Sequence, residues 1–325
     1  MKKLLVCLLS LSCSATGLNA QTLACANDYV PNQKAITVSR SIAEELTKVE
    51  LSEPWTVRKD RLRKAADAGG DFKVRNDLAS ALMHTGDPKA AIQILKEIER
   101  TNPGLYQTAS NLGTASELAG ENEKALDWIR KGIERNPKSH DSSEWIHVRI
   151  LEEKIAGAKS QSWFNNDSLL GLNFSSGTTP IQPTILPTGN SGEPLTLEQV
   201  EAGLKYQLHE RLQFVKPVDR IVASLLFDLG NIIALKAEGI GMAQGTYELA
   251  AKYAQSDKPD YSDIRVMIDI RLSKARNSNQ KHSFIAGLVN NPVPLVFILA
   301  VSAVITLYVV GKIRESRKKR ALAQS

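Results

Sequence analysis

The chain has 325 residues, of which 42% are hydrophobic and 23% charged. It is long and apolar enough for one or two folded domains, which excludes a chain that is disordered throughout. Its net charge of +6 comes from its two ends, the pair Lys2 and Lys3 and the basic cluster of residues 312–320, so that residues 21–311 are close to neutral. Because a nucleic-acid binder is expected to carry positive charge on its folded part, we exclude that class.

Residues 1–20 have the features of a signal peptide. A lysine pair precedes an apolar run, and the small residue Ala20 stands where cleavage is expected. Lipid modification at Cys13 is an alternative. Cleavage would leave Cys25 as the last of the three cysteines, and a single cysteine forms neither an internal disulfide nor a zinc site.

A second apolar run lies near the C-terminus. Residues 292–311 contain no charged side chain, and a helix of about 20 apolar residues spans a bilayer. We predict a transmembrane helix at 292–311, after a juxtamembrane segment at 276–291 and before a basic cytoplasmic tail at 312–325. Because basic residues stay in the cytoplasm, the expected location is the inner (cytoplasmic) membrane, single-pass, with the N-terminal domain in the periplasm. A processed sorting signal beginning at Asn291 is the alternative.

The strongest pattern is an internal repeat. The stretch from Phe72 to Pro103 aligns with the stretch from Tyr106 to Pro137, at a constant offset of 34 residues. The matched pairs are Leu78 and Leu112, Gly86 and Gly120, Ala91 and Ala125, Leu95 and Ile129, and Pro103 and Pro137. Since a glycine ends one helix and an Asn-Pro pair breaks the next, each copy is predicted to form a helical hairpin.

These hairpins resemble the tetratricopeptide repeat (TPR), which has this period. Arg75 and Pro88 depart from the usual aromatic residues at their positions. The resemblance implies an all-α fold, a TPR-like helical-hairpin solenoid with flanking helices, plus one C-terminal transmembrane helix. Because two hairpins do not bury a solenoid core alone, we expect N-terminal capping helices at 21–71 and a further capping helix after the repeats, within 72–157.

The resemblance also implies a protein-binding concave face on the first helix of each hairpin. The residues implied there are Lys73, Asn76, Asp77, Ser80, His84, Gln107, Ser110, Asn111, Thr114, Leu118 and Glu144. Repeats that bind a C-terminal carboxylate use Lys, Asn and Arg on this face, and only Asn111 fits that set. We therefore expect a mixed polar groove for another protein or peptide. The alternative is that the face holds only the chain's own linker.

The second half of the chain begins with a change of composition. Residues 158–195 become rich in Gly, Pro, Ser and Thr, which predicts a linker whose apolar first part packs on the solenoid. Helices resume with a capping box formed by Thr196 and Gln199. We predict a C-terminal helical, degenerate TPR-like region at 196–275.

No pattern of catalytic, cofactor-binding or metal-binding residues stands out. Glu144 and His147 are spaced to share a metal, but no third ligand accompanies them. His209 and Glu210 lack the histidine of the zinc-protease motif, because Gln213 stands at its position. We expect no enzymatic activity and no cofactor. The predicted function is a membrane-anchored periplasmic scaffold that assembles an envelope complex through protein–protein interaction.

Two other functions stay open on the sequence. One is an enzyme whose site lies in 196–275 and uses the repeats for docking; the residues to watch would be Tyr206, His209, Glu210 and Asp228. The other is a structural cell-envelope protein that binds peptidoglycan. A cluster of those four side chains in one buried pocket would favour the enzyme.

Overall fold

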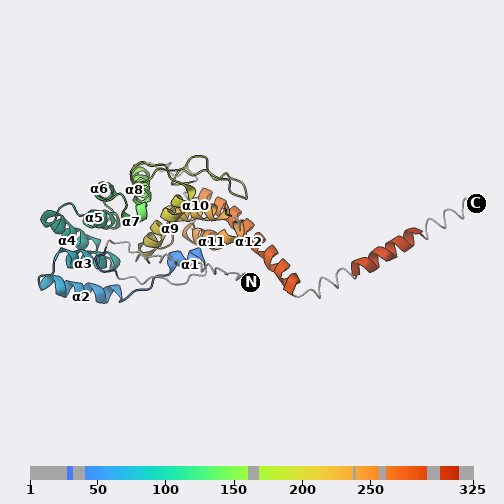
Figure 1. Ribbon diagram of the computed structural model, residues 1–325, viewed down its shortest axis with the longest axis horizontal. Helices are drawn as coiled ribbons and strands as arrows, with labels where there is room; N and C mark the ends of the chain where they lie inside the picture. Colours follow the sequence, from blue (N-terminus) through green and yellow to red (C-terminus); the bar gives the residue numbers. More distant parts are fainter. Residues whose placement is uncertain are drawn as a thin grey trace, which may run out of the picture. The chain divides into compact units, whose positions relative to one another are not determined.

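The computed structural model describes residues 28–31, 41–159, 168–236, 239–255, 261–290 and 301–314 (Figure 1). Regular structure in these residues is helical, and the strand-like features among them are isolated bridge positions, at Leu51 and between Thr188 and Pro194. The prediction of an all-α fold is therefore confirmed. The chain divides into two compact units, which are described separately.

The first unit consists of residues 1–155 and 209–214. Its helices are α1 (Ile42–Thr47), α2 (Trp55–Asp67), α3 (Phe72–His84), α4 (Pro88–Thr101), α5 (Tyr106–Leu118), α6 (Asn122–Arg135), α7 (Ser139–Ser142) and most of α8 (Glu144–Lys159). The starts of α3 and α5 keep the offset of the sequence repeat, as do the starts of α4 and α6. Consecutive helices pack on one another from α2 to α6, so that the two hairpins lie side by side (Figure 1).

The ends of these helices follow from local chemistry. Asp71 caps α3 and Asp87 caps α4, each by accepting hydrogen bonds from backbone N–H groups of the first turn. Gly86 and Gly120 follow the first helix of each hairpin with φ of 84° and 80°. Because side chains with a Cβ rarely adopt that left-handed conformation, glycine at these positions allows the chain to turn into the second helix.

Small residues allow the paired helices to approach closely. Ala91 and Ala125 are fully buried in the two hairpins. Gly113 of α5 faces Ile129 of α6, and a Cβ added to Gly113 would lie 2.4 Å from Ile129 Cδ1 and 3.2 Å from its backbone nitrogen. The second hairpin therefore has no room for a side chain at this glycine.

A left-handed turn leads from α6 to α8. Residues 140–142, inside α7, have φ between 49° and 59°. Beyond this turn, Leu151 of α8 packs against Ala125 and Ile129 of α6. This apolar contact attaches α8 to the second hairpin.

The second unit consists of residues 156–208 and 215–325. Its helices are the first part of α9 (Leu197–Phe214), α10 (Arg220–Ala234), the 3₁₀ helix η1 (Gly239–Ala243), α11 (Gln244–Tyr253) and α12 (Ser262–Asn290); residues 301–314 are also helical. Both α10 and α12 pack against α11 and η1.

Part of the predicted linker, residues 168–195, is held on this second unit. Four of its apolar side chains are buried: Leu169, Leu170, Leu172 and Phe174. Arg271 of α12 is itself fully buried and donates hydrogen bonds to the carbonyl oxygens of Phe174 and Ser175, at 3.0 and 2.9 Å. Apolar burial and backbone pairing together fix the start of this segment.

The predicted transmembrane helix is not found in the part of the chain that the structure describes. Within the described residues, no helix has both the length and the apolar character needed to cross a bilayer. The prediction of a single-pass inner-membrane protein with a periplasmic domain is therefore wrong. The predicted signal peptide at 1–20, as well as residues 291–300 of the predicted span, lie outside the described residues.

We expect Gly113→Val to destabilise the first unit by about 1–3 kcal/mol, because the added side chain overlaps Ile129. Thermal and chemical denaturation followed by circular dichroism would measure the change. Gly177→Val is the control, since a Cβ at Gly177 meets nothing closer than 3.9 Å, and its effect should stay below about 0.5 kcal/mol. Equal stability of Gly113→Val and the wild type would contradict the close approach of α5 and α6.

Candidate functional site

The face predicted on α3, α5 and the start of α8, called the inner face below, is largely buried. The side chains of Asn76, Asp77, Ser80, Ser110, Asn111 and Glu144 are at most 2% exposed. His84, Gln107 and Thr114 are partly buried, while Lys73 and Leu118 are exposed. The amides of Asn76 and Asn111 connect α3 and α5 directly, because Asn111 Nδ2 donates to Asn76 Oδ1 at 2.9 Å. The structure thus brings residues of the two repeats together in one polar layer.

Residues 28–31 lie on this face. The carboxylate of Asp77 accepts the backbone N–H groups of Tyr29 and Val30, at 2.6 and 3.0 Å. The ring of Tyr29 meets the ring of Phe72 edge-on, with centroids 5.6 Å apart. The inner face therefore holds a short non-helical stretch of polypeptide through its backbone as well as through a side chain.

A buried arginine accompanies this contact. Arg58 of α2 is 2% exposed, and its Nη2 lies 3.5 Å from Asp77 and 3.3 Å from Asp28. It also donates to the carbonyl oxygen of Val30. Burial, followed by the charge of Asp77, raises the pKa of Asp28 to about 8. The positive charge of Arg58 lowers this pKa but offsets only part of the rise. Arg58 Nη1 also lies 3.7 Å from Glu53, so a single guanidinium pairs with three carboxyl groups.

The carboxylate of Glu117, near the end of α5, contacts three basic side chains. Arg211 in the last turns of α9 donates from Nη1 to Oε1 at 2.8 Å and from Nη2 to Oε2 at 3.1 Å. Lys154 Nζ lies 2.6 Å from Oε1, and His147 Nε2 lies 2.7 Å from Oε2. Burial alone would raise the pKa of Glu117, but the attraction of these three groups holds it well below its usual value.

Three rings stack beside this cluster. Phe214, the last residue of α9, lies on His84 with ring centroids 4.3 Å apart, and His84 lies on Trp55 with centroids 3.7 Å apart. Burial lowers the pKa of His84 to about 3, so that its imidazole is neutral at physiological pH. The stack is therefore an uncharged aromatic contact between the end of α9 and the inner face.

Glu210 belongs to the same end of α9 but finds no comparable partner. Its side chain is 4% exposed, and neither carboxyl oxygen has a hydrogen-bond partner in the described part of the chain. Burial, followed by the charges of Asp28 and Glu144, raises its pKa well above the usual value. Raising the pKa favours the protonated form, and burying a carboxyl group unpaired is unfavourable by about 1–3 kcal/mol.

Two stretches of the chain, residues 28–31 and 209–214, thus cover the inner face. The sequence left a partner protein and the chain's own linker open as occupants. In this structure the two stretches that contact the face both lie outside that linker. Sequence reasoning missed Arg58 and Glu117, which hold the two stretches. The sequence alone does not show which charged residues on a helix surface form ion pairs with residues far along the chain.

The four residues considered for an enzyme do not gather in either unit. His209 and Glu210 belong to the first unit, whereas Tyr206 and Asp228 belong to the second. Asp228 is fully buried and accepts a hydrogen bond from Ser168 Oγ at 2.8 Å. Among the residues that the structure describes, no group of three or more His, Cys, Asp or Glu side chains is placed to hold a metal ion.

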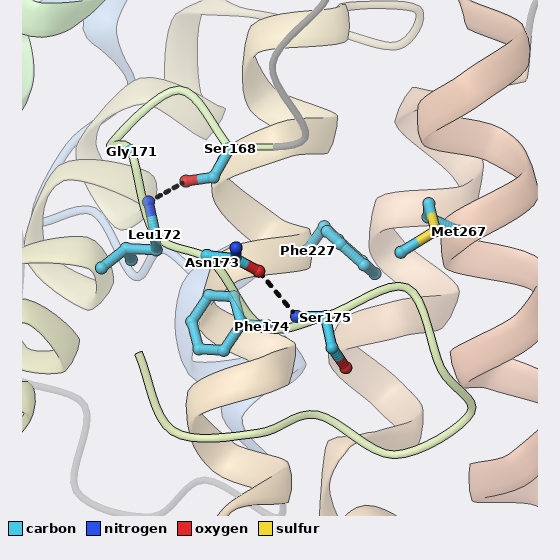
Figure 2. A pocket seen from close by; sticks show the side chains of 8 residues that line it. All are labelled: Ser168, Gly171, Leu172, Asn173, Phe174, Ser175, Phe227 and Met267. Carbon is cyan, nitrogen blue, oxygen red and sulfur yellow. Dashed lines mark hydrogen bonds between the residues drawn. The ribbon is translucent and has the colours of Figure 1, made fainter. Parts of the chain in front are cut away.

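The second unit contains a pocket of about 270 Å³. Figure 2 shows that its wall is the segment around residues 168–175, together with Phe227 of α10 and Met267 of α12. Asn173 Oδ1 accepts the backbone N–H of Ser175 at 3.0 Å (Figure 2), so a side chain of the wall is used to hold the wall itself. None of the residues that line it is charged.

Compared with models of known protein families and with curated proteins, the chain matches none. The resemblance to TPR proteins therefore stays a prediction, based on the repeated sequence positions.

His147 gives the first unit a pH dependence of known sign. Burial alone would lower its pKa, but the carboxylates of Glu117 and Glu144 raise it above its usual value. Its contribution to stability is therefore present below the unfolded pKa of about 6.5 and is lost as the pH rises through the folded pKa. At pH 6 we expect His147→Gln to be less stable by about 1.5–3 kcal/mol.

Thermal denaturation between pH 6 and 9 would follow this effect as the difference between the two melting curves, which should shrink with rising pH. His282→Gln, at an exposed position of α12, is the control and should leave the melting temperature unchanged. A difference that grows with pH would show that His147 is not the cation on Glu117.

Glu210→Gln tests the unpaired carboxyl group. Since the folded pKa is raised, wild-type stability falls as the pH rises from about 4.5 towards that pKa. Glutamine does not titrate, so the variant should melt higher than the wild type at pH 8 and lose most of this advantage near pH 4.5. Glu123→Gln, exposed on α6, serves as the control. A variant that melts lower at pH 8 would indicate that Glu210 has a partner in the native protein.

Proposed function

We propose that this chain is a helical-repeat protein whose first unit binds other proteins and serves as a scaffold for their assembly. The observation that carries the proposal is the inner face, which already holds polypeptide in two forms. Residues 28–31 pair with Asp77 through their backbone, and the helical residues 209–214 pair with Glu117 through Arg211. A surface with both kinds of contact suits the peptides and helices of other proteins.

In this proposal the hairpins α3–α4 and α5–α6 are two TPR units. Helices α2 and α8 are the flanking helices that complete a short solenoid, as isolated hairpins of this kind require. The constant offset of the helices, the fully buried alanines at matched positions and the packing of Leu151 on α6 support this assignment.

The chemistry of the inner face favours binding over catalysis. Its most polar groups, such as Glu117 and Asp77, are engaged with cations or backbone N–H groups. A catalytic site would require such groups to face a space in which a substrate can react. Ion pairs and hydrogen bonds within the polypeptide are instead the contacts that one protein segment makes with another.

Site-specific photo-crosslinking in the full-length chain tests the proposal. The crosslinking amino acid replaces Lys73 or Leu118, which are exposed on the first helices of the hairpins. Matched controls replace Lys96 of α4 or Glu134 of α6, which are exposed on the second helices. We expect the first pair to give a defined adduct with another protein and the second pair to give none. Adducts from the control positions alone, or from no position, would contradict a partner on the inner face.

A further inference from the structure

We propose that residues 209–214 at the end of α9 occupy the place of a partner, and that the inner face selects a helix presenting an arginine followed three positions later by an aromatic residue. The inference rests on the proposed function and specifies the chemistry of the partner. Such a partner binds by displacing residues 209–214.

The arginine requirement comes from the geometry at Glu117. Both carboxylate oxygens accept from the guanidinium of Arg211, at 2.8 and 3.1 Å. A planar guanidinium makes two such bonds at once, which an ammonium group does not. When Arg211 leaves, Lys154 and His147 of α8 stay on the same carboxylate. The face therefore does not keep an uncompensated buried charge while one arginine is exchanged for another.

The aromatic requirement comes from the ring stack. His84 and Trp55 lie parallel, with 6° between their planes, and both belong to the hairpin side of the contact. Phe214 adds only the outer ring. Because the imidazole of His84 is buried and uncharged, it offers an apolar surface on which another phenyl, tyrosyl or indole ring can lie.

The spacing comes from α9 itself. Arg211 and Phe214 are three positions apart in a helix, which places them on one side of it. Glu117 and His84 lie near the C-terminal ends of α5 and α3, so the two anchors contact adjacent first helices of the two hairpins. A helical turn of a partner with the same spacing would reach both anchors.

The residue before the arginine makes the chain's own segment replaceable. Glu210 is buried beside Asp28 and Glu144 without a hydrogen bond to its carboxyl oxygens. This unfavourable burial opposes the two favourable anchors that follow it in the helix. A partner helix with a neutral residue at that position keeps both anchors without the buried carboxyl group. The chain's own segment keeps one advantage over a free partner. Because it is covalently connected, its effective concentration at the face is in about the millimolar range.

A direct test uses a fluorescent peptide with the sequence of residues 197–214 and the full-length protein. We expect weak binding to the wild type, whose face is occupied. The variant Arg211→Ala/Phe214→Ala removes both anchors of the chain's own segment and should bind the peptide at least about tenfold more tightly by fluorescence anisotropy. Equal affinity of the two proteins for the peptide would overturn the inference.

Peptide and protein variants then test each anchor. The variant Arg211→Ala/Phe214→Ala is called the opened protein. A peptide with Glu210→Gln should bind the opened protein more tightly than the parent peptide, whereas peptides with Arg211→Ala or Phe214→Ala should lose most of their affinity. Adding Glu117→Gln to the opened protein should remove the preference for peptides with the arginine but keep the preference for peptides with the aromatic ring. Binding that ignores these changes would overturn the assignment of the anchors.

Circular dichroism and thermal melting show whether the opened variant is folded. Should it be unfolded, Phe214→Ala alone provides the same comparison, because it removes one anchor and leaves the ion pair. The outcomes also separate the two proposals. A crosslinked partner together with a peptide insensitive to its arginine and aromatic residue would refute this inference alone. Selective peptide binding with no crosslinked partner would refute the proposed function alone.

Discussion

The ion cluster on Glu117 is the contact on which the arrangement of the first unit depends. Arg211 from α9 and Lys154 and His147 from α8 all reach one carboxylate on α5, whose side chain is 7% exposed. Buried charges add little net stability, because desolvation offsets their attraction, but removing one partner is strongly unfavourable. The cluster therefore acts mainly by specifying position. It determines which turn of α9 lies on the inner face and where α8 lies against α5.

The close packing of the hairpins makes that cluster possible. Gly113 and Ala125 leave no space between α5 and α6, and the amides of Asn76 and Asn111 connect α3 with α5. These contacts form a closely packed surface that carries Glu117 and Asp77. Since both carboxylates are on the first helices of the hairpins, the stretches of chain that bind them lie on the same face.

Charge on the covering segment is concentrated in one residue. Burial lowers the pKa of His209, and burial with neighbouring carboxylates raises the pKa of Glu210, so both shifts favour the neutral forms. The contact of residues 209–214 with the face therefore relies on Arg211 for its electrostatic part and on Phe214 for its aromatic part. The His209 ring also lies 3.1 Å from the carbonyl oxygen of Glu45 in α1. Another helix with an arginine and an aromatic residue at the same spacing could reproduce the contacts at Glu117 and His84, which is the physical basis of the proposed exchange.

The amino-acid sequence by itself determined the helical hairpins, their period and the glycines that end their first helices, because each of these is encoded locally along the chain. Its long apolar run predicted a membrane helix, and this was wrong because no described helix is both long and apolar enough to cross a bilayer. Only the tertiary structure decided what covers the inner face. Glu117 and Arg211 are 94 positions apart, and Asp77 lies 48 positions from Tyr29. Contacts between such distant residues leave no periodic trace in the sequence, since folding alone brings them together.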